Sequence, residues 1–157
     1  MPGNYLLNPN FDADLAGWTI SDPAAIFGGE DADEAPSSGS VQTTVTIQTE
    51  SVAQCVDAAV IPERFDWVRL HARARITEQA ATDVSVEAVL SFFDQSGCAG
   101  VQLGTASSAA IVGDTAGLWN ALTIQMQVPP GALSVSASFE AAPTDVVPTR
   151  TWRSTAP

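Results

Sequence analysis

Aromatic and cationic side chains alternate along one short stretch of the chain. In "WVRLHARARI" (67–76), Val68, Leu70 and Ala72 alternate with Trp67 and basic residues. Side chains at alternate positions of a β-strand share a face and lie about 6.6–7 Å apart. An aromatic ring packs on the C–H face of a pyranose, whereas Arg and His side chains hydrogen-bond hydroxyl groups. The stretch therefore predicts a sugar-recognition stripe of Trp67, Arg69, His71 and Arg73.

Other polar and aromatic residues would extend this stripe if their strands were adjacent to it. Two rings would stack on a sugar, and five polar groups would hydrogen-bond its hydroxyls. The expected set is Gln54, Trp67, Arg69, His71, Glu87, Phe93 and Gln125, with Ser91 and Gln127 on the same face. The pattern also fits a solvated outer face with Arg–Glu cross-strand pairs, each worth less than about 1 kcal/mol. Both interpretations stay open.

The charge of the chain limits its partners. The formal net charge is −12 over 157 residues, without any Lys, and four of the six basic residues fall between Arg64 and Arg75. A polyanion needs clustered cations, so nucleic acid is disfavoured as a partner. No apolar run approaches the length of a membrane span, and no secretory signal is visible at the start. The length is typical of one domain.

The residue types that enzymes use are not arranged for catalysis. His71 is the single His, it lies among Arg residues in an expected strand, and no Gly-x-Ser-x-Gly sequence accompanies it. A glycosidase needs two carboxylates at a set separation, and no spacing among the 18 acidic residues marks such a pair. No Gly-rich phosphate loop occurs. We therefore expect a protein that is not an enzyme.

The elements that would position these residues are β-strands. Apolar and polar residues alternate with period 2 in several segments, namely 41–47, 67–76, 84–93, 122–128 and 133–140. Turn-forming sequences rich in Gly, Pro, Ser and Asp separate them, and no helical stripe of ten or more residues is present. The sequence predicts a single all-β domain, an antiparallel β-sandwich (jelly roll) of roughly eight to ten strands.

The order of several short motifs resembles a known family. These are "NYLLNPNFDADLAGW", "EDADEAPSSGSVQ", "SVAQCVDA", "DWVRLHARARI", "VSVEAVLSFFDQSGCAG" and "GLWNALTIQMQVPPGALSVSAS". Together they resemble the CenC-type carbohydrate-binding modules, which are galactose-binding-domain-like jelly rolls. The likeness covers residues 4–140, and residues 141–157 form a Pro/Thr-rich tail or a degenerate last strand.

The resemblance implies a secreted or extracellular, non-catalytic module that binds a polysaccharide or other glycan on a concave sheet. Composition alone leaves Cys55 and Cys98 as a disulfide or two buried thiols, and the resemblance implies the disulfide. It also implies a structural Ca²⁺, with Asp12 as a ligand and with contributions from carbonyls of residues 37–40 and the acidic loop of Glu30, Asp31 and Asp33. The alternative for this acidic run is a plain surface loop. A rival interpretation is a structural or interaction domain without a sugar site.

The end of the chain departs from the family pattern. The family usually finishes with a Phe-Asp-Asp-Val strand whose Asp often ligates calcium, whereas this chain ends in "TRTWRSTAP". One hypothesis is a frameshift, since shifted GC-rich codons can read Ala-Asp-Val-Ala-Phe-Asp-Gly-Ala. On that hypothesis the sheet has an incomplete edge, which invites dimerisation, and the calcium site is impaired.

Overall fold

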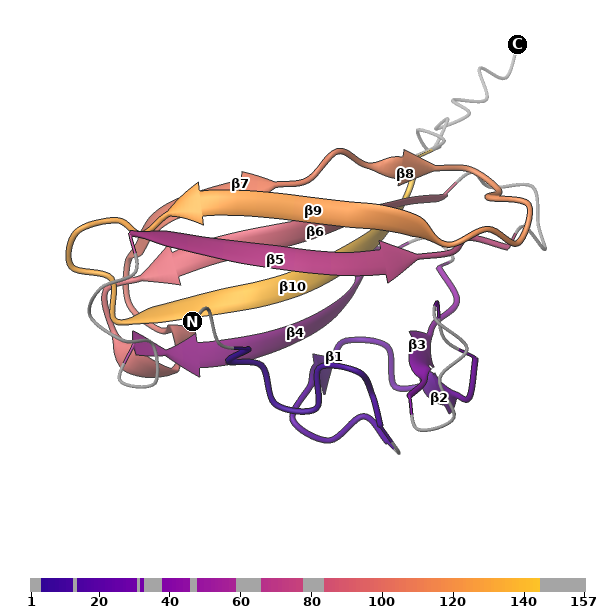
Figure 1. Ribbon diagram of the computed structural model, residues 1–157, viewed down its shortest axis with the longest axis horizontal. Coiled ribbons are helices and arrows are strands. Elements are labelled where there is room, and N and C mark those ends of the chain that lie inside the picture. Colours follow the sequence, from indigo (N-terminus) through magenta and orange to yellow (C-terminus); the bar gives the residue numbers. More distant parts are fainter. Residues whose placement is uncertain are drawn as a thin grey trace, which may run out of the picture.

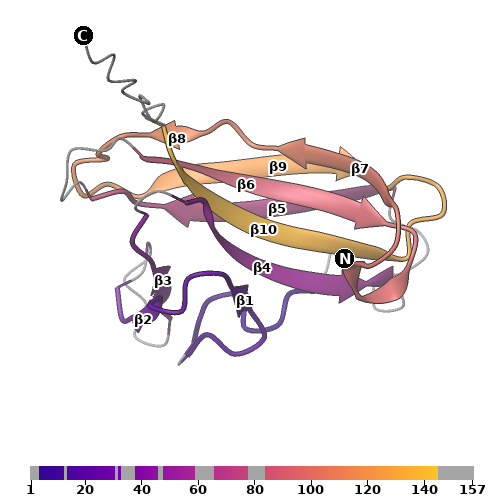
Figure 2. The ribbon, with the colours of Figure 1, turned by 180° about the vertical axis from the view of Figure 1, so that it is seen from behind.

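The computed structural model is an antiparallel β-sandwich, which confirms the predicted fold class (Figures 1 and 2). It describes residues 4–12, 14–30, 32, 38–45, 48–58, 66–77 and 84–144. Ten strands lie within these ranges, and no helix in them is long and apolar enough to cross a membrane. The strands are β1 (Thr19–Ile20), β2 (Ile26–Gly28), β3 (Ser40–Gln42), β4 (Glu50–Asp57), β5 (Trp67–Ala74), β6 (Val84–Phe93), β7 (Gln102–Ser107), β8 (Ile111–Val112), β9 (Asn120–Gln127) and β10 (Ser134–Pro143).

The larger layer has the strand order β1-β4-β10-β6-β7, and β8 also pairs with β6. Its pairings are antiparallel, and the long strand β10 lies at its centre between β4 and β6, as Figure 2 shows. The second layer is the two-stranded pair of β5 and β9, while β2 and β3 pair separately to one side (Figure 1). The stripe predicted on residues 67–73 therefore belongs to the smaller layer.

The core fills the space between the two layers. Leu70 of β5 and Leu122 and Ile124 of β9 belong to the same buried cluster as Leu90 and Phe92 of β6. These residues occupy alternate positions of their strands, so the opposite positions of each strand point outward. Burial of such side chains stabilises the fold by roughly 1.5–3 kcal/mol each. The period-2 pattern thus sets which side chains of β5 and β9 reach solvent.

Most of the expected strands are present. Segment 84–93 matches β6, but the strand expected over 41–47 ends at Gln42, and residues 46–47 lie outside the described residues. Phe27 of β2 is 37% exposed, because β2 and β3 pair apart from the sandwich. β10 runs to Pro143, whereas residues 145–157 lie outside the described residues, so the tail and the frameshift hypothesis stay untested.

A disulfide joins Cys55 of β4 to Cys98, which confirms the implied pairing. Cys98 ends a short 3-10 turn, Ser96–Cys98, in the loop between β6 and β7. The Gly97 N–H donates to Asp57 Oδ1 (2.7 Å), and the Cys98 N–H donates to Ser134 Oγ (3.0 Å). These bonds and the disulfide attach the loop to the outer face of the larger layer, where β4 ends and β10 begins.

Candidate functional site

The outer face of β5 and β9 is a continuous polar surface. In the antiparallel register Trp67 is opposite Gln127, Arg69 is opposite Gln125, and His71 is opposite Thr123. All six side chains are exposed. We call this set, together with Arg73, the β5–β9 face. The structure therefore brings together Trp67, Arg69, His71 and Gln125, four of the seven residues of the expected site.

Two cross-strand hydrogen bonds organise the middle of the β5–β9 face. Arg69 Nη2 donates to Gln125 Oε1 at 2.9 Å, and His71 Nδ1 lies 2.8 Å from Thr123 Oγ1. Trp67 is next to Arg69 on the same side of β5, and 53% of its surface is exposed. An exposed ring beside planar polar groups is the combination that sugar recognition uses. Thr123 was missed by the sequence analysis, although it occupies an outward position of an alternating segment.

The two remaining described arginines of this region differ in their surroundings. Arg73 is exposed at the far end of the β5–β9 face, and its Nη1 donates to the Ala32 carbonyl at 3.2 Å. Arg75 follows β5, forms an ion pair with Glu30, and stands over the Trp119 ring at 5.0 Å from its centroid. A guanidinium held by a carboxylate and an aromatic face stabilises the local fold. Arg75 is therefore a structural residue.

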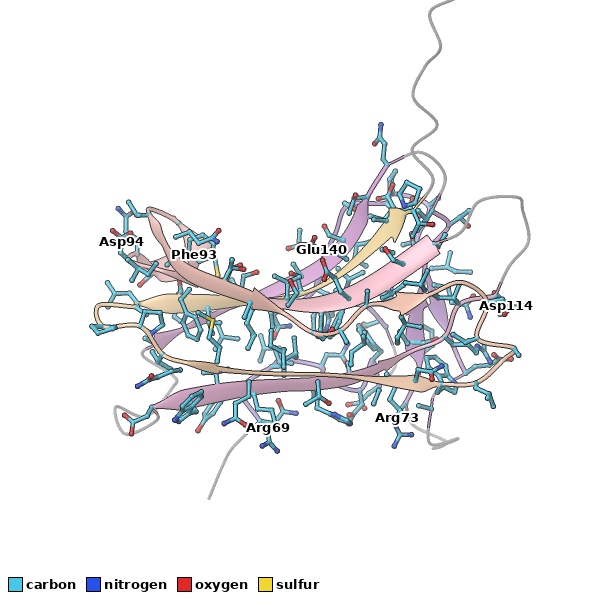
Figure 3. The ribbon with its side chains drawn as sticks, turned by 90° about the horizontal axis from the view of Figure 1, so that it is seen from above. Arg69, Arg73, Phe93, Asp94, Asp114 and Glu140 are labelled. Atoms are coloured by element: carbon cyan, nitrogen blue, oxygen red, sulfur yellow. A yellow bond between two sulfur atoms is a disulfide. The ribbon has the colours of Figure 1, made fainter. Side chains whose placement is uncertain are left out.

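Glu87 and Phe93 lie on the opposite side of the molecule, which corrects the expectation that they share the face of Trp67. Their strand β6 pairs with β10, β7 and β8 and has no pairing with β5. Figure 3 shows Phe93 and Glu140 above the sandwich and Arg69 and Arg73 below it. The larger sheet bends toward the Glu140 side in this view, whereas β5 and β9 run nearly straight. The stripe is therefore on a flat face and not on the expected concave sheet.

Gln54 is buried at 5% exposure, which corrects its expected place on the sugar-contacting face. Its Oε1 accepts the Leu7 N–H at 2.6 Å, and its Nε2 donates to the carbonyls of Leu7 (3.0 Å) and Gly17 (2.8 Å). Gly17 has a φ of 86°, a left-handed conformation that favours glycine. Since the amide is occupied by backbone groups, Gln54 attaches the N-terminal segment to the sandwich.

The expected calcium ligand Asp12 is exposed, and its backbone N–H donates to Asn8 Oδ1 at 2.7 Å. Calcium requires six to eight oxygen ligands, several of them carboxylates. Within the part of the chain that the structure describes, no group of three or more His, Cys, Asp or Glu side chains could hold a metal. Asp31, Asp33 and residue 37 lie outside that part, so the calcium site stays a prediction.

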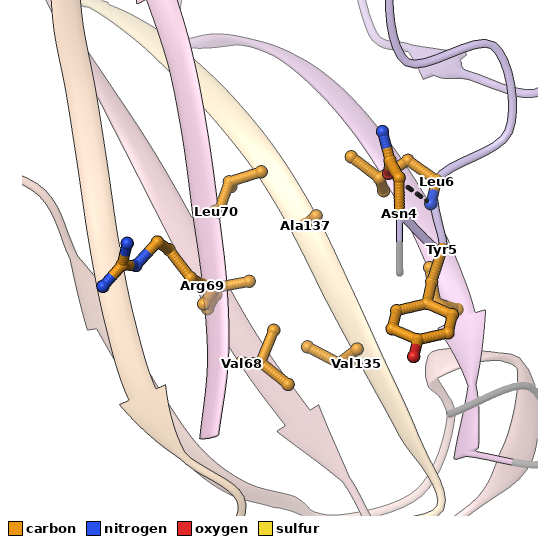
Figure 4. A pocket seen from close by; sticks show the side chains of 10 residues that line it. Asn4, Tyr5, Leu6, Val68, Arg69, Leu70, Val135 and Ala137 are labelled. Carbon is orange, nitrogen blue, oxygen red and sulfur yellow. Dashed lines mark hydrogen bonds between the residues drawn. The ribbon is translucent and has the colours of Figure 1, made fainter. Parts of the chain in front are cut away.

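A small cavity lies between the layers, next to the N-terminal segment (Figure 4). Its volume is about 90 Å³, and apolar side chains of both layers line most of it, with Asn4, Tyr5 and Arg69 at its border. Pockets for small ligands usually measure about 300–1,000 Å³. The cavity is therefore a gap in packing that is too small to hold a sugar ring.

Comparison with known proteins places the fold. No family model matches the sequence. The curated proteins give no match either. Among solved structures, the C-terminal family 22 carbohydrate-binding module of Clostridium thermocellum xylanase 10B is 15% identical with a TM-score of 0.56, and the match covers 85% of this chain and 86% of that one. The N-terminal module–catalytic domain pair of the same enzyme, complexed with xylohexaose, is 8% identical with a TM-score of 0.53, over 85% of this chain and 26% of that one.

The enzymatically active domain of tailspike protein 4 from bacteriophage CBA120 also contains a similar region. It is 17% identical with a TM-score of 0.60, and the match covers 88% of this chain. This chain spans 19% of the length of that tailspike chain. At these identities the likeness shows the fold alone. The resemblance is therefore to β-sandwiches that include family 22 carbohydrate-binding modules, and is not specific to the CenC type.

Proposed function

We propose that this chain is a non-catalytic, glycan-binding module that uses the β5–β9 face. The observation that carries the proposal is the position of Trp67, more than half exposed beside the hydrogen-bonded pair of Arg69 and Gln125. The ring offers a stacking platform, and the paired groups are already oriented to bond hydroxyls. The fold supports the proposal because two of the structural neighbours include carbohydrate-binding modules.

The outer face of the larger sheet is less suited to stacking on a sugar. Phe93 is half-buried there. Ser91 Oγ and Thr105 Oγ1 lie 3.0 Å apart and bond each other, and Ser134 Oγ is occupied by the Gln95 carbonyl at 2.5 Å. Stacking requires an accessible ring face. Trp67, which is 53% exposed, meets this requirement better than Phe93.

The flat shape of the β5–β9 face favours an extended ligand. Outward side chains repeat about every 6.6–7 Å along a strand, so a polysaccharide lying along β5 would meet Trp67, Arg69 and His71 in turn. A flat surface buries one side of a sugar chain and leaves the other in water, which predicts weak binding. The disulfide agrees with an oxidising, extracellular location. This location is part of the proposal.

The test is binding of soluble polysaccharides, measured by affinity electrophoresis and by Trp fluorescence. We expect the wild-type protein to be retarded by at least one polysaccharide, and Trp67→Ala to lose most of that retardation. The matched control is Phe27→Ala, which removes another exposed aromatic ring from the separate β2–β3 pair. A third variant, Phe93→Ala, reports on the opposite face.

The result separates three possibilities. Loss of binding in Trp67→Ala alone supports the proposal. Loss in Phe93→Ala with normal binding by Trp67→Ala moves the site to the larger sheet and contradicts it. If the wild-type protein binds none of a broad set of plant, fungal and bacterial polysaccharides, the chain is a structural or interaction domain instead.

A further inference from the structure

The cations of this acidic chain are concentrated on and beside one strand. The net charge is −12 without any Lys, yet Arg69 and Arg73 both project from the outer side of β5 (Figure 3). His71 lies between them on the same side. Two arginines on one strand make the potential there less negative than over the rest of an acidic surface, so an anionic ligand meets the least repulsion at that strand.

The bond that holds Arg69 does not neutralise it. Gln125 is uncharged, and the hydrogen bond between the two residues uses Nη2 of the guanidinium. A guanidinium has five N–H donors in a planar fork that matches a carboxylate. His71 likewise lies against a neutral hydroxyl, that of Thr123. Arg75, by contrast, has its carboxylate partner in Glu30. Arg69 therefore retains both its charge and donors for an acidic ligand.

Resting on the function proposed above, we infer that the β5–β9 face selects acidic polysaccharides, chains whose sugar units carry uronic acid carboxylates. Arg69, fixed by Gln125, binds a carboxylate of the chain in a charge-assisted hydrogen bond. Trp67 stacks on a sugar ring of the same chain. His71 and Arg73 lie further along the same side of β5, toward the neighbouring units. The row would raise affinity and also set the orientation of the bound chain.

The same chemistry fits a nucleic acid less well. Double-stranded DNA carries one charge per about 1.7 Å of its axis, and its binding requires many cations. The β5–β9 face offers a single short row in a protein of net charge −12. A uronic acid chain has one carboxylate on each acidic sugar, and between these charges it presents apolar C–H faces to an aromatic ring. Trp67 and Arg69 together match that alternation of apolar and charged groups.

The experiment compares polygalacturonate and alginate with their carboxyl-reduced counterparts, which keep the chain but lose the charge. Affinities are measured by electrophoresis and calorimetry at about 0.01 M and 0.15 M salt, between which the Debye length falls from about 30 to 8 Å. We expect at least one acidic chain to bind roughly tenfold or more tightly than its reduced form, and to weaken as salt rises. We expect Arg69→Gln to lower that affinity by about tenfold.

The matched control is Gln102→Glu, at an exposed position of β7 in the other layer. It changes the net charge by the same single unit as Arg69→Gln, but away from the β5–β9 face. We expect its affinity for the acidic chains to stay within about twofold of the wild-type value at 0.15 M salt. Arg69→Lys, which keeps the charge and loses the planar fork, should fall between Arg69→Gln and the wild-type protein. Thermal melting confirms that each variant is folded.

Each outcome decides between the two proposals. Equal affinity for acidic and reduced chains, or binding of neutral polysaccharides alone, overturns the acidic preference and leaves the glycan-binding function intact. Equal losses in Arg69→Gln and Gln102→Glu also overturn it, because overall charge would then explain the effect. Binding of a single-stranded DNA oligonucleotide with the same dependence on Arg69 replaces polysaccharide selection by general polyanion binding. If no polysaccharide binds, both proposals fail.

Discussion

Glu87 lies directly opposite Glu140 in the antiparallel pairing of β6 with β10. Both carboxylates are half-buried on the outer face of the larger sheet. Like charges directly opposite each other on adjacent strands destabilise a sheet. The larger layer therefore retains an unfavourable pair at its centre.

We predict that Glu87→Gln raises the free energy of unfolding at neutral pH by about 0.2–1 kcal/mol. Glu140→Gln should have a similar effect. The stability gained by the double variant should be smaller than the sum of the two single gains, because both substitutions remove the same repulsion. Urea denaturation of the two single variants and the double variant measures this. Destabilisation by both single variants would contradict the prediction and show that the carboxylates make a favourable interaction.

Replacement of Gln54 should destabilise the fold without a specific effect on sugar binding. Gln54→Leu keeps a side chain of similar size but leaves the Leu7 N–H and the carbonyls of Leu7 and Gly17 without their partner. An unsatisfied buried polar group costs about 1–3 kcal/mol. Denaturant unfolding should show a loss in this range, whereas Gln102→Leu, at an exposed position, should change stability by less than about 0.5 kcal/mol.

Removal of the disulfide should lower stability substantially. Cys55 and Cys98 are separated by 43 residues in sequence. The chain-entropy account of a closed loop of that length gives about 4 kcal/mol of stabilisation, although engineered and native bridges range from about 0 to 5. The double variant Cys55→Ser with Cys98→Ser should unfold at a correspondingly lower guanidinium concentration. Reductant should shift the wild-type curve in the same direction and leave the double variant unchanged.

Asp22 should make stability depend on pH below neutrality. The Thr43 hydroxyl, which donates to Asp22 Oδ2 at 2.6 Å, and the Ala24 N–H lower the pKa of this carboxyl from its ordinary value of 3.8. Since the folded pKa is the lower one, the contribution is present above pH 3.8 and is lost as pH falls through the folded value. Asp22→Asn should be less stable than the wild type at pH 7, and the difference should shrink toward pH 2 in denaturant titrations. A constant difference across that range would refute the assignment.

The local pattern of the sequence predicted the strands better than it predicted their neighbours. Segment 84–93 alternates over its whole length and forms β6, because a half-buried strand must place apolar side chains on one side. Alternation does not identify the pairing partner of a strand. Trp67 and Phe93 were therefore expected to share a face, although β5 pairs with β9 and β6 pairs with β10.

The burial of Gln54 had a signal in the sequence. Within β4 it lies two residues from Val52 and two residues from Val56, both of which are buried. Alternate residues of a strand share a face, so the period-2 pattern places Gln54 on the core side of the strand. Its residue type favours a polar face, in conflict with this position. By contrast, Arg69 and Gln125 each occupied an outward position of its own strand, but their contact depends on the register of β5 and β9. Nothing in either segment alone gives that register.

The outward strand positions of the two layers carry charges of opposite sign, which makes a local transverse dipole. Among the described residues, Arg69 and Arg73 stand on one side and Glu140 stands on the other (Figure 3). Near an anionic surface such a dipole experiences a torque that turns β5 toward that surface before any contact forms. At about 0.15 M salt this torque acts only within roughly 8 Å. A domain fused to this chain would then be held in one preferred direction relative to the surface.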